Sequence, residues 1–139
     1  MTTEQLNNLA KIGEIHPELA DASEFDGLVK SARDRLQDIS QNKLSDAGQF
    51  DLAYNAAHAL ALAALRWHGF RSTNRYQVFQ FLIHTVSLSA EKTQIFSQCH
   101  RLRNVAEYEW HLEIEESLLN ELIKHTNELL KTLEALEAI

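Results

Sequence analysis

The sequence predicts an all-α fold, a compact up-and-down bundle of about five helices that forms a single domain over residues 1–139. Only four glycines and one proline occur in 139 residues, whereas a β-rich fold needs turn residues at short intervals. Apolar residues make up 45% of the chain, which indicates a globular core rather than disorder. Apolar positions also recur at helical spacing along most of the chain.

The first half of the chain predicts three helices. A short leading helix is expected over 4–13, and Pro17 suits a first helical position because proline has no N–H to leave unsatisfied. Ser23 and Asp26 form a possible capping pair for a second helix that runs to about Asn42. Ser45 and Gly69 suit the start and the end of a third helix. This third helix is apolar on nearly all sides and rich in alanine, which predicts the buried centre of the bundle.

The second half predicts the remaining helices. Thr73 or Asn74 is expected to cap the fourth helix, and Ser89 the fifth. The last helix is expected from about Trp110 to the end of the chain. No glycine or proline follows Ala90, so the fifth and last helices either meet at a kink or continue as one. The last helix carries a leucine-rich stripe that suits a core, a homodimer seam or a partner interface.

Several classes of protein are disfavoured. The single cysteine, Cys99, allows neither an intramolecular disulfide nor a multi-cysteine metal site, and its apolar surroundings favour a buried free thiol. The first residues lack the basic start and apolar run of a signal peptide. No stretch reaches the 18 or more apolar residues of a membrane span. We therefore expect a cytoplasmic location and no membrane partner.

The charge is unevenly distributed. The net charge of −7 argues against nonspecific nucleic-acid binding by the whole surface. Residues 60–106, however, hold six arginines and lysines against one acid, between flanks that are both acidic. We call residues 60–106 the basic island. It indicates either acidic and basic helices packed side by side or a local site for an anion such as phosphate.

No strong metal or cofactor motif is present. A di-iron bundle needs Glu-x-x-His pairs, which do not occur in this sequence. Glu107, His111 and Glu115 share a helix face, but an exposed polar face explains them equally well. Phosphate-binding glycine loops, His-Glu-x-x-His and Gly-x-Ser-x-Gly are also missing. We expect neither a metal nor a cofactor.

One segment, residues 99–111, has the composition of a binding site. On a helix, Arg103 and Glu107 lie four residues apart, and so do Asn104 and Tyr108 on an adjoining line. Arginine is a permanent forked donor suited to phosphate, and tyrosine offers a hydroxyl and a stacking face for a base. The alternative is an Arg103–Glu107 ion pair within the helix beside a packed tyrosine, which would contribute little to stability.

Two stretches resemble the HEPN superfamily of small α-helical domains. They are Tyr-Asn-Ala-Ala-His-Ala-Leu-Ala-Leu-Ala-Ala-Leu-Arg-Trp-His-Gly-Phe-Arg at 54–71 and Leu-Arg-Asn-Val-Ala-Glu-Tyr-Glu at 102–109. The first is similar to the family's alanine-rich central helix, and the second to its Arg-polar-x-x-x-His segment. The resemblance covers about 20–135. It implies a helical bundle and a homodimer in which two Arg-Asn segments face each other.

The same resemblance implies functions. Many relatives cleave RNA without a metal, often as toxins or in defence against foreign nucleic acid. Others bind nucleotides or pair with a nucleotidyltransferase that acts as antitoxin. By this resemblance Arg103 holds the scissile phosphate and Asn104 orients it, while Tyr108 stands where the family has its catalytic histidine. Further substrate contacts are expected from the neighbouring polar residues, namely His100, Arg101, Glu107 and His111.

Tyr108, in place of the family histidine, leaves open whether the protein cleaves RNA. With a pKa near 10, tyrosine is a poor base at neutral pH, so His100 or His111 would have to replace the family histidine. The first expectation is an RNA- or nucleotide-binding domain with a dimeric Arg103–Asn104 cleft, with or without ribonuclease activity. The alternatives are a non-catalytic module that binds a partner protein, such as a nucleotidyltransferase-type antitoxin, and a small-molecule or metal enzyme of another type.

Overall fold

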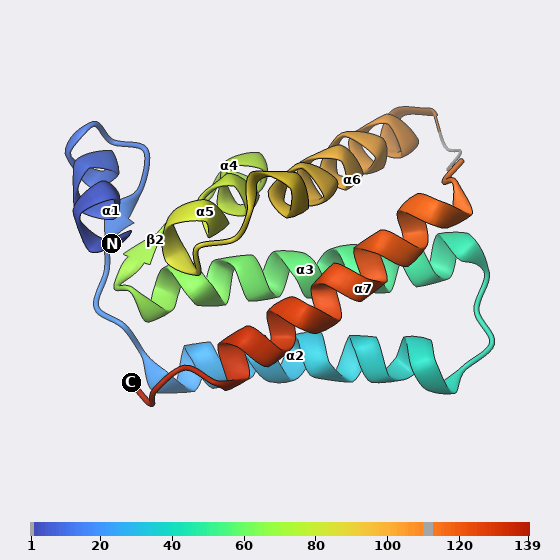
Figure 1. The fold of residues 1–139 in the computed structure, drawn as a ribbon, viewed down its shortest axis with the longest axis horizontal. Helices are drawn as coiled ribbons and strands as arrows, with labels where there is room; N and C mark the ends of the chain where they lie inside the picture. The colour runs from blue at the N-terminus through green and yellow to red at the C-terminus, as the bar shows by residue number, and fades with distance from the viewer. Residues whose placement is uncertain (1, 110–112) are drawn as a thin grey trace.

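The computed structural model describes residues 2–109 and 113–139, with side chains described for residues 4–106 and 113–139. The chain forms an all-α bundle, as predicted (Figure 1). The elements are α1 (Thr2–Lys11), β1 (His16–Pro17), α2 (Ala22–Gln41), α3 (Asp46–Trp67), β2 (Phe70–Arg71), α4 (Arg75–Gln80), α5 (Leu82–Thr85), α6 (Ala90–Glu109) and α7 (Glu116–Glu134). None of the described helices combines the length and the apolar character of a membrane span.

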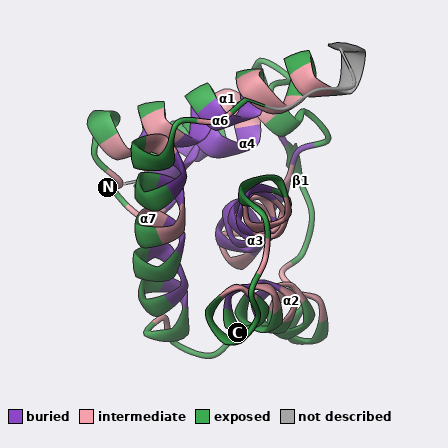
Figure 2. Cartoon of the chain, turned by 90° about the vertical axis from the view of Figure 1, so that its right-hand side faces the viewer, coloured by how far each residue is buried: buried purple, intermediate pink, exposed green. Residues whose placement is uncertain are grey.

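Helix α3 is the centre of the bundle. Helices α2 and α3 run antiparallel, α7 crosses both obliquely, and α4 to α6 cover the remaining side of α3 (Figure 1). The end-on view shows α3 buried between α2, α7 and the α4–α6 layer (Figure 2). Seven alanines of α3 are buried, and their small side chains allow the neighbouring helices to approach closely. The prediction of a buried central helix is confirmed.

The local stop and start signals explain the boundaries of several helices. Ser45 caps α3 by accepting a hydrogen bond from the Gly48 N–H at 3.0 Å, and Asn74 caps α4 in the same way. Gly69 follows α3 with a φ of 84°, a left-handed conformation that glycine adopts without a steric penalty. These predictions, and the Ser89 cap of α6, are confirmed.

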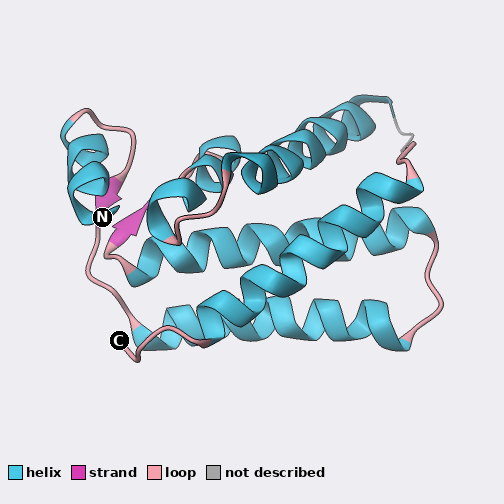
Figure 3. Cartoon of the chain, viewed as in Figure 1, coloured by secondary structure: helices cyan, strands magenta, loops and turns pink. Residues whose placement is uncertain are grey.

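Other local predictions are wrong. Pro17 does not begin a helix: it lies in β1, which pairs antiparallel with β2 (Figure 3). The cap of α2 is Asp21, which accepts from the Glu24 N–H, rather than Ser23. The fourth predicted helix is divided into α4 and α5 at Phe81. At the start of α2 two neighbouring polar residues could act as the cap, and the structure uses Asp21; Pro17 is instead taken up in the pairing with Phe70.

Helices α6 and α7 are separate. Helix α6 ends at Glu109 and α7 begins at Glu116, later than the predicted start near Trp110, and residues 110–112 lie outside the described part. The leucine stripe of α7 packs into the main core: Leu122, Leu129 and Leu133 are buried, and Ile114, Leu118 and Leu136 are partly buried against it. Of the three uses predicted for this stripe, the structure gives it the role of core.

A buried arginine fastens the end of α3 to the segment before α2. Arg66 is 1% exposed. Its guanidinium donates to the Glu24 carboxylate at 2.6 Å and to the backbone carbonyl oxygens of Glu18 and Leu19 at 2.7 and 2.6 Å. Arg71 also bonds Glu18 and Glu24, and the hydrogen bonds from Arg66 and Arg71 hold the pKa of Glu24 below its ordinary value. We call Glu18, Glu24, Arg66 and Arg71 the arginine latch.

A second, smaller core lies beside the arginine latch. It consists of Leu6, Ile15, Leu65, Phe70 and Phe81, and it seats α1 against the end of α3. The β1–β2 pair joins these two parts through the Pro17–Phe70 register. Helix α1 is therefore held against α5 and the residues around the end of α3, while the start of α2 is held by Arg66.

The contacts of the arginine latch predict that replacing Arg66 strongly lowers the free energy of unfolding. In Arg66→Met the Glu24 carboxylate loses one of its two arginine partners, and the Glu18 and Leu19 carbonyl oxygens lose a donor. We expect the free energy of unfolding to fall by about 3 kcal/mol, measured by urea denaturation at neutral pH. The control is Arg33→Met, which breaks the exposed Arg33–Glu134 pair and should cost less than about 1 kcal/mol. Equal losses in the two variants would contradict a structural role for the latch.

Candidate functional site

A polar cluster lies where α3 passes beneath α6. It consists of Tyr54 from α3 and His100, Arg103 and Asn104 from α6, and we call these four residues the polar cluster. Three of them belong to the predicted site. They share a region of α6 because positions i, i+3 and i+4 lie on one side of a helix.

His100 is the centre of the polar cluster. Its ring is 8% exposed, and Nδ1 lies 2.8 Å from the Tyr54 hydroxyl oxygen. Nε2 lies 3.2 Å from the side-chain amide nitrogen of Asn104. When the amide nitrogen donates to Nε2, a neutral imidazole carries its proton on Nδ1 and donates it to the Tyr54 oxygen. His100 therefore orients Asn104 on the outer side and Tyr54 on the inner side.

Arg103 reaches from α6 to α3. Its guanidinium carbon lies 4.9 Å from the centre of the Tyr54 ring, which is a cation–π distance. Its Nη1 also points to the Asn55 side-chain oxygen at 3.5 Å, a long contact. Arg103 is half-buried and Asn104 is exposed. The pair thus presents a fixed cation and a fixed amide at the edge of the helix packing.

Aromatic rings form the floor of the polar cluster. Tyr54 is buried and contacts Phe50 and Phe79, with ring centres 6.1 and 5.7 Å apart. The half-buried ring of Tyr76, from α4, lies 5.6 Å from that of His100. Burying the Tyr54 hydroxyl and the His100 ring would be costly if they were unpaired, but their mutual hydrogen bond satisfies both.

His58 lies one helical turn beyond Tyr54 on α3. Its ring meets the edge of Phe79 at a centre distance of 6.0 Å. Partial burial, and then unfavourable electrostatic interactions with Arg75, His100 and Arg103, lower the pKa of His58 to about 4. His58 is therefore neutral at neutral pH, in surroundings that are cationic.

The predicted site residues have different outcomes. His100, Arg103 and Asn104 come together as the polar cluster. Arg101 is exposed on α6, and no contact between described residues brings it into the cluster. The side chains of Glu107, Tyr108 and His111 lie outside the described part, so their places in the site, and the alternative Arg103–Glu107 pair, stay predictions.

The sequence analysis missed the contribution of α3 and α4. The periodicity of the sequence places Tyr54 and His58 only within a buried helix, and it predicts no role in a site for Asn55 or Tyr76. A signal was present: Tyr54 and His58 are polar groups at i, i+4 within a helix that is otherwise mostly apolar. Such a pair predicts a line of polar side chains on one face of this helix. It does not predict which other helix packs against that face.

The basic island is divided by the structure. Arg66 and Arg71 belong to the arginine latch and pair with acids of the first half of the chain, which is the side-by-side packing of acidic and basic segments predicted as one alternative. Lys92 approaches Glu128 of α7 at 3.7 Å. Arg103, and Arg75 through its effect on His58, lie at the polar cluster. The packing of acidic and basic segments therefore accounts for part of the basic island, and the proposal of a phosphate site concerns the polar cluster.

Neither a reactive thiol nor a metal site is supported by the described residues. Burial raises the pKa of the Cys99 thiol to about 12, so the thiol stays protonated and inert, as its buried position predicted. The described residues hold no group of three His, Cys, Asp or Glu side chains suited to a metal.

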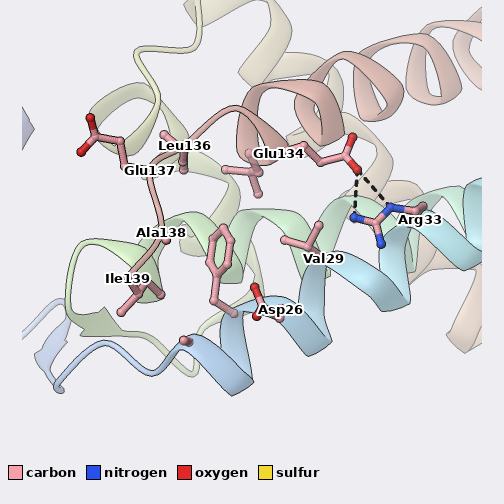
Figure 4. A pocket seen from close by; sticks show the side chains of 11 residues that line it. Asp26, Val29, Arg33, Glu134, Leu136, Glu137, Ala138 and Ile139 are labelled. Carbon is pink, nitrogen blue, oxygen red and sulfur yellow. Dashed lines mark hydrogen bonds and ion pairs between the residues drawn. The ribbon is translucent and has the colours of Figure 1, made fainter.

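A pocket of about 400 Å³ lies between the start of α2 and the C-terminal segment (Figure 4). Phe25, Val29 and Leu136 line it, and Arg33 is held at its side by Glu134, whose carboxylate accepts two hydrogen bonds at 2.8 and 3.0 Å. None of the predicted site residues lines this pocket. Its one lining arginine already has a carboxylate partner, so the pocket has less to offer an anion than the polar cluster.

The polar cluster predicts a stability effect of the Tyr54 hydroxyl. Tyr54→Phe keeps the ring packing but removes the partner of His100 Nδ1 in a buried setting. We expect the free energy of unfolding to fall by about 1–3 kcal/mol, measured by chemical denaturation. Tyr76→Phe is the matched control, because Tyr76 meets His100 through its ring, and it should cost less than about 0.5 kcal/mol. A Tyr54→Phe protein as stable as the wild type would show that the hydrogen bond contributes little.

Comparisons with family models, with curated proteins and with solved structures found no match to this chain. The case for a function therefore depends on the residues and geometry of the polar cluster.

Proposed function

We propose that this chain binds RNA or nucleotide phosphate at the polar cluster. The observation that carries the proposal is the placement of Arg103 and Asn104 side by side at the edge of α6, each fixed by a contact to a buried aromatic or histidine ring. A pre-oriented guanidinium and a neutral amide suit the oxygens of a phosphate group. Fixing both side chains before binding reduces the entropy lost on binding.

Two further features support a nucleic-acid ligand. Arg75 and Arg103 add positive charge around His58 in a protein whose net charge is −7, which favours a local anion site over a broad basic surface. The half-buried ring of Tyr76 beside His100 offers an aromatic surface next to the cations, and bases stack on such surfaces. The resemblance of residues 54–71 and 102–109 to HEPN domains agrees with this ligand class. By the same resemblance, the protein acts as a homodimer with a toxin-type or defence role.

The interaction-module alternative gains no support from α7. The leucine stripe suggested for a partner such as a nucleotidyltransferase-type antitoxin is buried in the core of this chain. A partner would have to use another surface. The two hypotheses differ in a simple observation, because a pure interaction module has no reason to bind RNA in a salt-dependent way.

Binding should depend on Arg103. We expect a single-stranded oligoribonucleotide to bind the wild-type protein with an affinity that falls as salt rises. Arg103→Ala should weaken binding by about tenfold or more and reduce the slope of log K against log salt by about 0.7, the value for one phosphate contact on a single strand. Fluorescence anisotropy over a salt series measures both quantities.

Two arginine variants serve as controls for this experiment. Arg101→Ala removes the same charge from an exposed position on the same helix and should weaken binding by a smaller factor. Arg35→Ala removes a half-buried arginine from α2 and should leave binding unchanged. Equal effects of all three variants would indicate nonspecific attraction, and RNA binding unaffected by Arg103→Ala would exclude Arg103 from its proposed role.

We expect binding without metal-independent cleavage. Among the described side chains, the imidazole nearest the phosphate site, that of His100, is buried and has both nitrogens hydrogen-bonded, and His58 is a weak base with a pKa of about 4. Incubation of labelled RNA with metal-free protein, with Arg103→Ala and Tyr108→Phe beside it, tests this. Cleavage by the wild type that is abolished in Arg103→Ala would instead identify a ribonuclease, and Tyr108→Phe would show whether that hydroxyl takes part.

A further inference from the structure

The pocket between the start of α2 and the C-terminal segment has apolar walls on both sides. Phe25 and Val29 line it from α2, and Leu133, Leu136 and Ile139 line it from α7 and the residues that follow (Figure 4). Its volume of about 400 Å³ lies within the range of small-molecule sites, near the lower end. A ligand with a small apolar body would therefore gain free energy by moving from water into this pocket.

The wall formed by the C-terminal segment is held in place at two points. Residues 135–139 follow α7 as a non-helical segment. Trp67, at the end of α3, donates from Nε1 to the carbonyl oxygen of Glu137 at 2.9 Å. Glu134, at the end of α7, accepts two hydrogen bonds from Arg33 of α2. These contacts form the pocket before a ligand arrives, which reduces the entropy lost on binding.

The charges that line the pocket favour a cation. Three acids, Asp26, Glu134 and Glu137, line it together with one arginine, Arg33. The charges of Glu134 and Arg33 offset each other through their ion pair. Figure 4 shows the Glu137 side chain directed away from Val29 and Arg33. Asp26 is thus the acid of the pocket whose charge is neither offset by Arg33 nor turned outward.

The Asp26 carboxylate is not used by the fold. It makes no hydrogen bond or ion pair with another residue of the described part of the chain. Lys30, one turn later on α2, bonds Asp34 at 2.7 Å instead. The cap of α2 is Asp21, so the capping role predicted for Asp26 is also filled by another residue. The carboxylate of Asp26 can therefore accept hydrogen bonds from a ligand that carries an N–H donor.

We propose that this pocket binds a small primary amine with an apolar body, of the arylalkylamine class. The ammonium group donates hydrogen bonds to Asp26, a charge-assisted interaction, and the apolar body packs between Val29 of α2 and Leu136 of the C-terminal segment. A carboxylate ligand of the same shape would meet repulsion from Asp26. The pocket shares no lining residue with the polar cluster, so this inference goes beyond the proposed function and does not rest on it.

Three probes of similar size separate charge from apolar burial: phenethylamine, phenethyl alcohol and hydrocinnamate, which are a cation, a neutral molecule and an anion at neutral pH. NMR titration of the full chain measures their dissociation constants. We expect about 1 mM or lower for the amine. The alcohol should bind about threefold more weakly, and the anion about tenfold more weakly, than the amine.

The same titration shows where the amine binds. The methyl signals of Val29, Leu136 and Ile139 should shift on addition of phenethylamine. The methyl signals of Ile12 and Ile83, which line a different pocket beside α1 and α5, should not shift and serve as the internal control.

One pair of variants tests the role of the carboxylate. Asp26→Asn should weaken phenethylamine binding by about threefold and leave phenethyl alcohol binding unchanged, because it removes the charge and keeps the shape of the side chain. The matched control is Asp38→Asn, which removes an exposed acid of the same helix outside the pocket and should keep the preference for the amine.

Several results would overturn the inference. They are equal binding of amine and alcohol by the wild type, an unchanged preference for the amine in Asp26→Asn, and a response of the control isoleucines equal to that of the pocket methyl groups. If circular dichroism shows that Asp26→Asn does not fold, the three probes on the wild type still decide, because an anion that binds as tightly as the amine excludes the site. Arg103→Ala should bind phenethylamine as the wild type does, so the outcome is independent of RNA binding.

Discussion

The buried guanidinium of Arg66 is the interaction on which the arrangement of the other elements depends. A charge at 1% exposure is stable only when it is fully paired, and its partners are a carboxylate and backbone carbonyls from the segment that precedes α2. The need to satisfy this one group fixes the last turn of α3 against the start of α2. The same guanidinium also donates to the Phe70 carbonyl oxygen of β2 at 3.3 Å, and β2 pairs with β1.

With its end fixed, α3 is enclosed by α2, α7 and the α4–α6 layer (Figure 2). Its alanines allow this close packing, and they leave Tyr54 and His58 as large polar side chains on the side that faces α4 and α6. Burial of these two groups is compensated in different ways. Tyr54 gains a hydrogen bond from His100, whereas His58 remains neutral because of its lowered pKa. The same packing that builds the core therefore creates the polar cluster.

The distribution of charge follows from this architecture. A net charge of −7 and a basic island are compatible because part of the island neutralises acids of the first half of the chain within the arginine latch. The remaining arginines, Arg75 and Arg103, are separated by 28 residues in sequence but act on one histidine. If the polar cluster binds a phosphate as proposed, local geometry rather than long-range attraction selects the ligand, because the protein as a whole is acidic.

Local sequence features were sufficient for the helical class, the buried central helix and the caps at Ser45 and Ser89; they limited the cap of α4 to Thr73 or Asn74 and suggested His100, Arg103 and Asn104 as site residues. These are consequences of local chemistry: periodicity, breakers and turn residues act within a few positions. Three features come from the packing of the helices: α7 buries its leucines inward, Arg66 is bonded within the arginine latch, and Tyr54 of α3 meets His100 and Arg103 of α6 in the polar cluster. Those outcomes depend on which helix faces meet, and pairs of residues distant in sequence come into contact only through packing that no single segment encodes.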